Sequence, residues 1–229
     1  MMVGKDIGEP LTEMPRDAHY NGKDLPTFNT YLTVIVRDKD GKVIKIHKQR
    51  SHSPTSNFIQ WLLPGSYYSL TGRQITVTNI NGESNSWAPY RGPVSYPNTA
   101  VNNPSVVLMI QVGSGQQTNP SSATKLAAPI ANGSGTGQLI YGQPSVSTNI
   151  TVSGNSAYFY ISQSFNNQSG ATITITEVGL VTQIQANGLG CLYTQNFGPL
   201  LMWYDVLSSA RSIPNGGTLV IYYTFMVNP

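Results

Sequence analysis

The sequence predicts an all-β fold, an antiparallel β-sandwich of jelly-roll-like type with one short helix. Apolar and polar residues alternate with a period of two along most of the 229-residue chain. Segments rich in Gly, Pro, Asn and Ser separate these runs, and only one stretch has apolar residues at helical spacing. No internal repeat of fixed period appears, which disfavours a propeller or a solenoid. We expect a single sandwich domain over residues 29–229, preceded by an extended N-terminal arm over residues 1–28.

The arm and a hairpin come first along the chain. Residues 1–28 contain three prolines and few large apolar side chains, so an arm here needs contact with another surface to be ordered. Residues 31–37 and 42–48 are two β-rich runs, and Asp38-Lys39-Asp40-Gly41 joins them. An Asp-Gly turn between two such runs predicts a β-hairpin.

A short amphipathic helix is expected after the hairpin. Ser53 is suited to be its N-cap and Pro54 its first residue, and Pro64-Gly65 ends it. Its apolar residues, at spacings of three and four, are Phe58, Trp61 and Leu62.

The rest of the chain is expected to form strands joined by loops. The expected strands are residues 73–80, 105–112, 137–141, 145–152, 157–165, 172–185, 200–207 and 219–227. The two long loops, 82–104 and 113–136, suit a sandwich in which loops gather at the ends and carry contacts.

Charge is distributed unevenly along the chain. Residues 1–52 hold 9 of the 13 Lys and Arg and 7 of the 10 Asp and Glu, which leaves the remaining 177 residues nearly uncharged. A surface of mostly Asn, Gln, Ser, Thr and Tyr has little charge repulsion between copies. We interpret it as a surface that neighbouring molecules cover.

Composition excludes several classes of protein. Low charge with 13 Tyr, 6 Phe and 3 Trp is the opposite of the composition of disordered chains. One Cys excludes an intramolecular disulfide, and one Cys with three His excludes a structural zinc site within the chain. No apolar run is long enough to span a bilayer, and the first residues lack the apolar segment of a signal peptide, so we expect no membrane span and no secretion.

A search for catalytic motifs finds no nucleophile elbow, metalloprotease helix, phosphate-binding loop or dinucleotide fingerprint in the required setting. We therefore expect no enzyme activity, no metal and no cofactor. A polysaccharide hydrolase is a weaker alternative, for which Glu83, Glu177 and Asp205 are the only suitable acids after residue 52. Glu177 shares one side of a strand with Ile173 and Ile175. Either a bulge turns it outward, or its carboxylate is half-buried and bonded to backbone amides.

Two groups of residues are candidates for contacts with a partner. The first is a basic patch on the hairpin, whose charge with Asp38 and Asp40 totals +4; it comprises Arg37, Lys39, Lys42, Lys45, Lys48 and Arg50. It suits phosphates, but we prefer a solvated edge whose lysines prevent stray strand pairing. The arm, with three basic and five acidic residues, also argues against genome binding. The second group is aromatic and suits glycan stacking, a protein interface or the core: Trp87, Tyr90, Trp203 and Tyr204.

Four runs together resemble a pattern in structural proteins of tailed phages and archaeal viruses. They are Gln111-Val112-Gly113-Ser114-Gly115, Leu126-Ala127-Ala128-Pro129-Ile130, Gly137-Gln138-Leu139-Ile140-Tyr141 and residues 165–180, which begin Phe165-Asn166-Asn167-Gln168-Ser169-Gly170-Ala171 and end Glu177-Val178-Gly179-Leu180. The resemblance covers about residues 105–185 and concerns a β-fold more than an activity. It implies a virion component, and it carries over no catalytic residues.

The expected function is that of a virion structural protein, in first place a jelly-roll-type capsid subunit that self-assembles into a symmetric shell. The expected location is the virion, and the expected partners are other copies of the chain and other virion proteins. The alternative is a tail, spike or fibre protein whose long loops and aromatic residues bind a glycan of the host surface.

Overall fold

The computed structural model describes residues 19–20, 23–24, 27–51, 54–62, 75–87, 108–186 and 195–228. Antiparallel strands make up most of these residues, which also include one α-helix, α1 (Ser56–Leu62), and one short 3-10 helix, η1 (Pro120–Ser122). Two sheets share one apolar core, so the prediction of an antiparallel β-sandwich with one short helix is confirmed. No helix in the described ranges is long and apolar enough to cross a membrane.

The larger sheet has its central strand near the C-terminal end of the chain. Its order is β10 (Thr151–Ser153), β11 (Ser156–Asn166), β14 (Thr218–Asn228), β3 (Thr27–Arg37) and β4 (Val43–Arg50). The short strands β8 (Ile140–Tyr141) and β9 (Ser145–Val146) also pair with β11. Strand β4 is therefore one edge of this sheet.

The smaller sheet has the order β13 (Gln195–Ile213), β12 (Ile173–Ala186) and β7 (Leu108–Gly113). Register shifts interrupt the pairing of β12 with β13, and one of them lies between Ile175 and Glu177. Two separate hairpins complete the described strands: β1 (His19–Tyr20) with β2 (Lys23–Asp24), and β5 (Ile75–Thr78) with β6 (Ser84–Trp87).

The main core lies between the two sheets. It takes alternate residues of β3 and β14, such as Leu32, Val34 and Ile221, and packs them against Ile110, Ile175 and other residues of the smaller sheet. A second cluster lies on the opposite face of the smaller sheet, where Val181, Leu201 and Tyr204 meet Ala123 and Leu126 of the loop after β7. Strands of the smaller sheet are thus covered on both faces.

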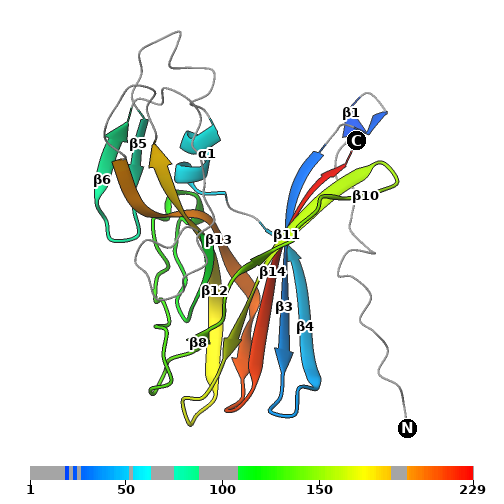
Figure 1. Ribbon diagram of the computed structural model, residues 1–229, viewed down its shortest axis with the longest axis vertical. Coiled ribbons are helices and arrows are strands. Elements are labelled where there is room, and N and C mark those ends of the chain that lie inside the picture. Colours follow the sequence, from blue (N-terminus) through cyan, green and yellow to red (C-terminus); the bar gives the residue numbers. More distant parts are fainter. Residues whose placement is uncertain are drawn as a thin grey trace.

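The two sheets lie side by side at one end of the molecule and diverge toward the other, which gives it the outline of a V (Figure 1). Exposure along the inner face of the larger sheet follows this divergence. Leu32 and Tyr223 are opposite one another and fully buried. Phe28 and Val227 are an opposing pair closer to the open end, and they are 57 % and 46 % exposed. Among the described residues, the inner face beyond Thr30 therefore has no complete second layer.

The expected arm needs a corrected end. Strand β3 begins at Thr27, so residues 27 and 28 belong to the sandwich, and residues 19–20 and 23–24 form a small hairpin rather than an extended arm. The remaining arm residues lie outside the described part of the chain. The predicted hairpin is present as β3 and β4, and Asp38 organises its turn by accepting bonds from the backbone N–H groups of Asp40 and Lys42 at 3.0 and 2.9 Å.

The predicted helix is present, but its predicted start is wrong. Pro54 forms a β-bridge with Trp203 instead of the first helical turn. Thr55 follows it along β13: its N–H donates to the Met202 carbonyl at 2.9 Å, and its hydroxyl donates to the Leu201 carbonyl at 2.6 Å. The helix therefore begins at Ser56, after the chain has left the edge of the sheet. Ser53 and Pro64-Gly65 lie outside the described residues.

Most of the predicted strands are present, with different lengths. The expected strand 145–152 is broken into β9 and β10, and residues 84–87, expected in a loop, form β6. Strand β13 is far longer than residues 200–207, because it begins at Gln195 and continues through residues 208–213, of which 211–213 pair with Ile173–Ile175. Of the expected strand 73–80, residues 75–78 form β5 and residues 79–80 lie in the turn after it, and residues 108–112 of the expected strand 105–112 belong to β7.

Candidate functional site

Glu177 is the most densely bonded side chain among the candidate acids. The register shift in β12 places it on the outer face of the smaller sheet, under the loop that follows β7, and it is fully buried. Its Oε1 accepts from the backbone N–H groups of Gly115 at 3.2 Å and Ala128 at 2.7 Å, and its Oε2 accepts from Ala127 N–H at 2.9 Å. A buried carboxylate is stable when N–H donors replace its water shell. The structure combines the two predicted alternatives: the bulge turns Glu177 away from the main core, and its carboxylate is bonded to backbone amides, although it is fully and not half buried.

Tyr204 completes the shell around Glu177. Its hydroxyl donates to Glu177 Oε2 at 2.7 Å and accepts from the backbone N–H of Gln117 at 2.7 Å. Burial raises the pKa of Tyr204 well above its usual range, and the hydrogen bond to Glu177 raises this pKa further. The tyrosine therefore stays neutral and donates its proton to the carboxylate. These four hydrogen bonds to Glu177, which we call the latch, fix the loop after β7 to the sheet.

Asp205 is the second buried acid, and it points to the opposite face of the sheet from its neighbour Tyr204. Its Oδ2 accepts from Ser51 Oγ at 2.7 Å and from the Tyr223 hydroxyl at 3.0 Å. Burial, followed by the charge of Asp205 and the hydrogen bond to it, raises the pKa of Tyr223. Because Tyr223 belongs to β14 and Asp205 to β13, this bond connects the two sheets across the core.

The three acids of the hydrolase alternative do not share one site. Glu83 is exposed in the turn between β5 and β6, where its Oε2 accepts from Asn79 Nδ2 at 2.7 Å. Glu177 and Asp205 are 0 % and 1 % exposed and lie on opposite faces of the smaller sheet, so neither can reach a polysaccharide in this structure. A pair of carboxyl groups flanking one cleft, as glycoside hydrolysis requires, is not formed by these residues.

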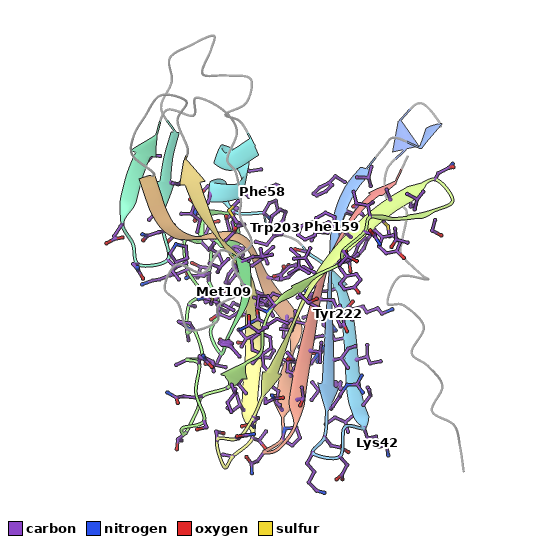
Figure 2. All side chains as sticks on the ribbon, viewed as in Figure 1. Lys42, Phe58, Met109, Phe159, Trp203 and Tyr222 are labelled. Atoms are coloured by element: carbon purple, nitrogen blue, oxygen red, sulfur yellow. The ribbon has the colours of Figure 1, made fainter. Side chains whose placement is uncertain are left out.

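The basic patch follows the hairpin but does not occupy a single face. Arg37 donates to the Gly41 carbonyl at 3.1 Å, and Lys39 forms an exposed ion pair with Asp40 at 2.9 Å. Lys45 is opposite Val36, which faces the core, whereas Lys48 is opposite Thr33 on the other face. Lys42 lies at the closed end of the molecule (Figure 2). Lys45, Lys48 and Arg50 are exposed along the edge strand β4. This spread suits the protected edge that we preferred from the sequence.

The aromatic candidates are separated by the fold. Tyr204 is fully buried, and Trp203 is 6 % exposed, with its ring centroid 3.9 Å from that of Phe58 and 5.1 Å from that of Phe225. Both are core residues, which was one of the interpretations of their pattern. Trp87 ends β6, its side chain lies outside the described part of the structure, and so does all of Tyr90.

A hollow of about 540 Å³ opens where the two sheets diverge. Figure 2 shows Phe58 and Trp203 on one side of this opening and Phe159 on the other. Its lining is mixed aromatic and polar: Phe28, Asn29, Thr30, Arg50, Ser51, Pro54, Phe58 and Trp203. The sequence did not indicate this hollow, because it depends on how far apart the two sheets lie at one end.

A smaller hollow of about 260 Å³ lies between β7, β11 and residues 129–132. Tyr141 lines it and donates to the Ile130 carbonyl at 2.6 Å. Burial raises the pKa of Tyr141 to about 12. Within the described residues, no cluster of His, Cys, Asp and Glu is suited to hold a metal ion.

Comparisons of the chain with models of protein families, with curated proteins and with solved structures found no match.

Proposed function

We propose that this chain is a virion structural protein, a capsid subunit of jelly-roll type that self-assembles into a symmetric shell. The proposal starts from the resemblance of residues 105–185 to structural proteins of tailed phages and archaeal viruses. Its proposed location is the virion, with other copies of the chain and other virion proteins as partners.

The observation that carries the proposal is the scarcity of charge on the described surface past residue 50. Past residue 50, the described part of the chain contains five charged side chains, and three of them, Glu177, Asp205 and Arg211, are buried. Only Glu83 and Lys125 remain exposed there. A free protein depends on surface charge to resist association, whereas a subunit whose surface is covered by neighbours does not. The near-neutral surface therefore supports a role in assembly.

The use of the buried acids also supports a structural role. Glu177 fixes a loop, and Asp205 connects the two sheets. The glycan-binding alternative has less support, because Trp203 and Tyr204 are core residues and only Trp87 and Tyr90 remain as its aromatic candidates.

The arm is the segment to test first. We expect that deletion of residues 1–18 leaves a folded sandwich, because β3 begins later, at Thr27, but prevents shell formation. Circular dichroism and thermal unfolding report the fold, and negative-stain electron microscopy with light scattering reports the particles.

The full-length chain under the same conditions is the control, and it should form closed particles of uniform size. Particles of normal size from the truncated chain would show that residues 1–18 are not needed for shell formation. A full-length chain that gives only a stable trimer or monomer would contradict the capsid proposal and favour a spike or tail protein.

A further inference from the structure

We propose that the inner face of the larger sheet at its diverging end is the interface between two copies of this chain, each copy supplying the layer that the other lacks. We call this surface the open face and define it as the row Val152, Ala157, Val227 and Phe28. The inference rests on the proposed function, because it names one of the contacts by which a subunit assembles.

Strand register places these four residues in a continuous row. Val152 is opposite Ala157, Ala157 is opposite Val227, and Val227 is opposite Phe28, so the row crosses β10, β11, β14 and β3. Directly opposed residues point to the same side of a sheet. That side is the inner one, because Val227 lies two and six residues from the core residues Phe225 and Ile221. The open face is thus the continuation of the core-forming face of the sheet.

Exposure shows where the second layer ends. In the row Ile161, Tyr223 and Leu32, no side chain is more than 5 % exposed. In the open face, Val152 is 71 %, Phe28 57 % and Val227 46 % exposed. Between the buried row and the open face lies a row that contains Phe159 and Phe225, whose rings stack with centroids 4.9 Å apart. Apolar side chains of a core-forming face are left in contact with water over one end of the sheet.

The chemistry of this end matches a second copy of itself. The strand segments that carry the row, residues 27–30, 145–160 and 224–228, contain no Asp, Glu, Lys, Arg or His. The charged residues described beside them are Arg50, which lines the adjoining hollow, and His19, Lys23 and Asp24 of the β1–β2 hairpin that precedes β3. Two such faces brought together by a twofold axis meet no like charges, and a twofold contact requires a surface that complements itself. Two sheets pack face to face at about 10 Å with their apolar sides inward, as the two sheets of this molecule already do.

The exposed apolar side chains supply the centre of such a contact, and the surface around them supplies the rest. The three exposed side chains of the row and the adjacent Ile150, 67 % exposed, present about 400 Å² of apolar surface. That is about half of what one partner contributes to a standard protein interface. The hollow lined by Phe58 and Trp203 borders the open face through Phe28, and its walls extend the available surface.

The test compares two double variants of the full chain by sedimentation velocity over a wide range of concentrations. V152E with V227E places carboxylates on the open face. I44E with I46E makes the same change at β4, where the two isoleucines are 50 % and 45 % exposed, and is the matched control. At concentrations below those at which shells form, we expect dimers of the unmodified chain and of the control, and an association constant at least about a hundredfold lower for the open-face variant. Circular dichroism and the thermal midpoint confirm that both variants are folded.

A second experiment pairs opposite charges across the interface. It tests for a gain of association, which a misfolded variant could not show. Val227 lies near the middle of the row, so V227K and V227E in different copies face each other across a central twofold axis. Each variant alone should be monomeric, and their mixture should form heterodimers.

Several outcomes would overturn the inference. They are an unmodified chain that stays monomeric, an open-face variant that dimerises as strongly as the control, and a monomer that binds phosphatidylcholine vesicles through this face. Failure of the capsid proposal is a separate result: dimers without shells would support the interface and contradict the capsid role. Normal shells from the open-face variant would support the capsid role and contradict the interface.

Discussion

Glu177 shows how a single side chain can organise a long loop. Three backbone N–H groups and one hydroxyl converge on its two oxygens, and the residues that supply them, Gly115, Ala127, Ala128 and Tyr204, are 27 to 62 positions away in the sequence. Because Glu177 follows Ile173 and Ile175 on one side of a regular strand, the sequence predicted either a bulge or a carboxylate bonded to backbone amides, and the structure has both. The sequence could not indicate the donors, because these depend on the path of a loop without periodic pattern.

We expect E177Q to lower the free energy of unfolding by about 3 kcal/mol, because hydrogen bonds to a charged group are lost and the amide leaves at least one buried N–H without an acceptor. Urea denaturation measures the change. The matched control is E83Q, in an exposed turn, which should change stability by less than about 0.5 kcal/mol. Equal effects of the two variants would contradict the role assigned to Glu177.

At the scale of elements, the loop after β7 can dock only because the end of that strand is a glycine. A Cβ atom added at Gly113 would lie 2.6 Å from the Ala128 carbonyl oxygen and would overlap Glu177 Oε1. Both of these atoms are fixed, the first by the Ser114 N–H at 2.9 Å and the second by the latch. The strand and the loop therefore have no room to adjust.

G113A should destabilise the protein by about 3 kcal/mol and increase protease cleavage in residues 114–128. G179A on β12 is the comparison, since its Cβ would meet methyl groups of Leu201 and Leu126, which can shift, at 2.6 and 3.0 Å. Its cost should be about 1 kcal/mol. If G113A is as stable as G179A, the loop is not held in the way described.

Local signals predicted some elements well and others poorly. The Asp-Gly turn placed the β3–β4 hairpin within a few residues, because its geometry is contained in the turn itself. Ser53 and Pro54 had the pattern of a helix start, but Pro54 is held by its bridge to Trp203, 149 residues later. Residues 208–212 gave no strand signal, and the pairing of Arg211 and Ser212 with β12 extends β13. Long-range contacts override local preference in both cases.

At the scale of the whole molecule, two buried and neutral tyrosines set an upper limit on the pH at which the fold is stable. Burial raises the pKa of Tyr141 to about 12 and raises that of Tyr223 as well. The folded state therefore keeps both phenols protonated after they ionise in the unfolded chain, whose tyrosines have a pKa of about 10. Their contribution to stability is fully present below pH 10 and is lost as the pH rises from there toward the folded pKa.

Urea denaturation at increasing pH should show this loss. Each of these two tyrosines should lower the free energy of unfolding by about 1.4 kcal/mol per pH unit above pH 10. Y141F should have a shallower slope, whatever its stability at neutral pH. A slope that Y141F leaves unchanged would show that other groups cause the alkaline unfolding.

The position of β14 between β3 and β11 has a consequence for when the protein becomes able to assemble. Strand β3 pairs with residues more than 180 positions later, so during synthesis β3 and β11 both wait for β14 before they join one sheet. The row Val152, Ala157, Val227 and Phe28 does not exist before that moment, because β14 contributes its centre. A chain synthesised only as far as β11 therefore cannot present the proposed dimer surface, and subunits can associate through it only after β14 has paired with β3 and β11.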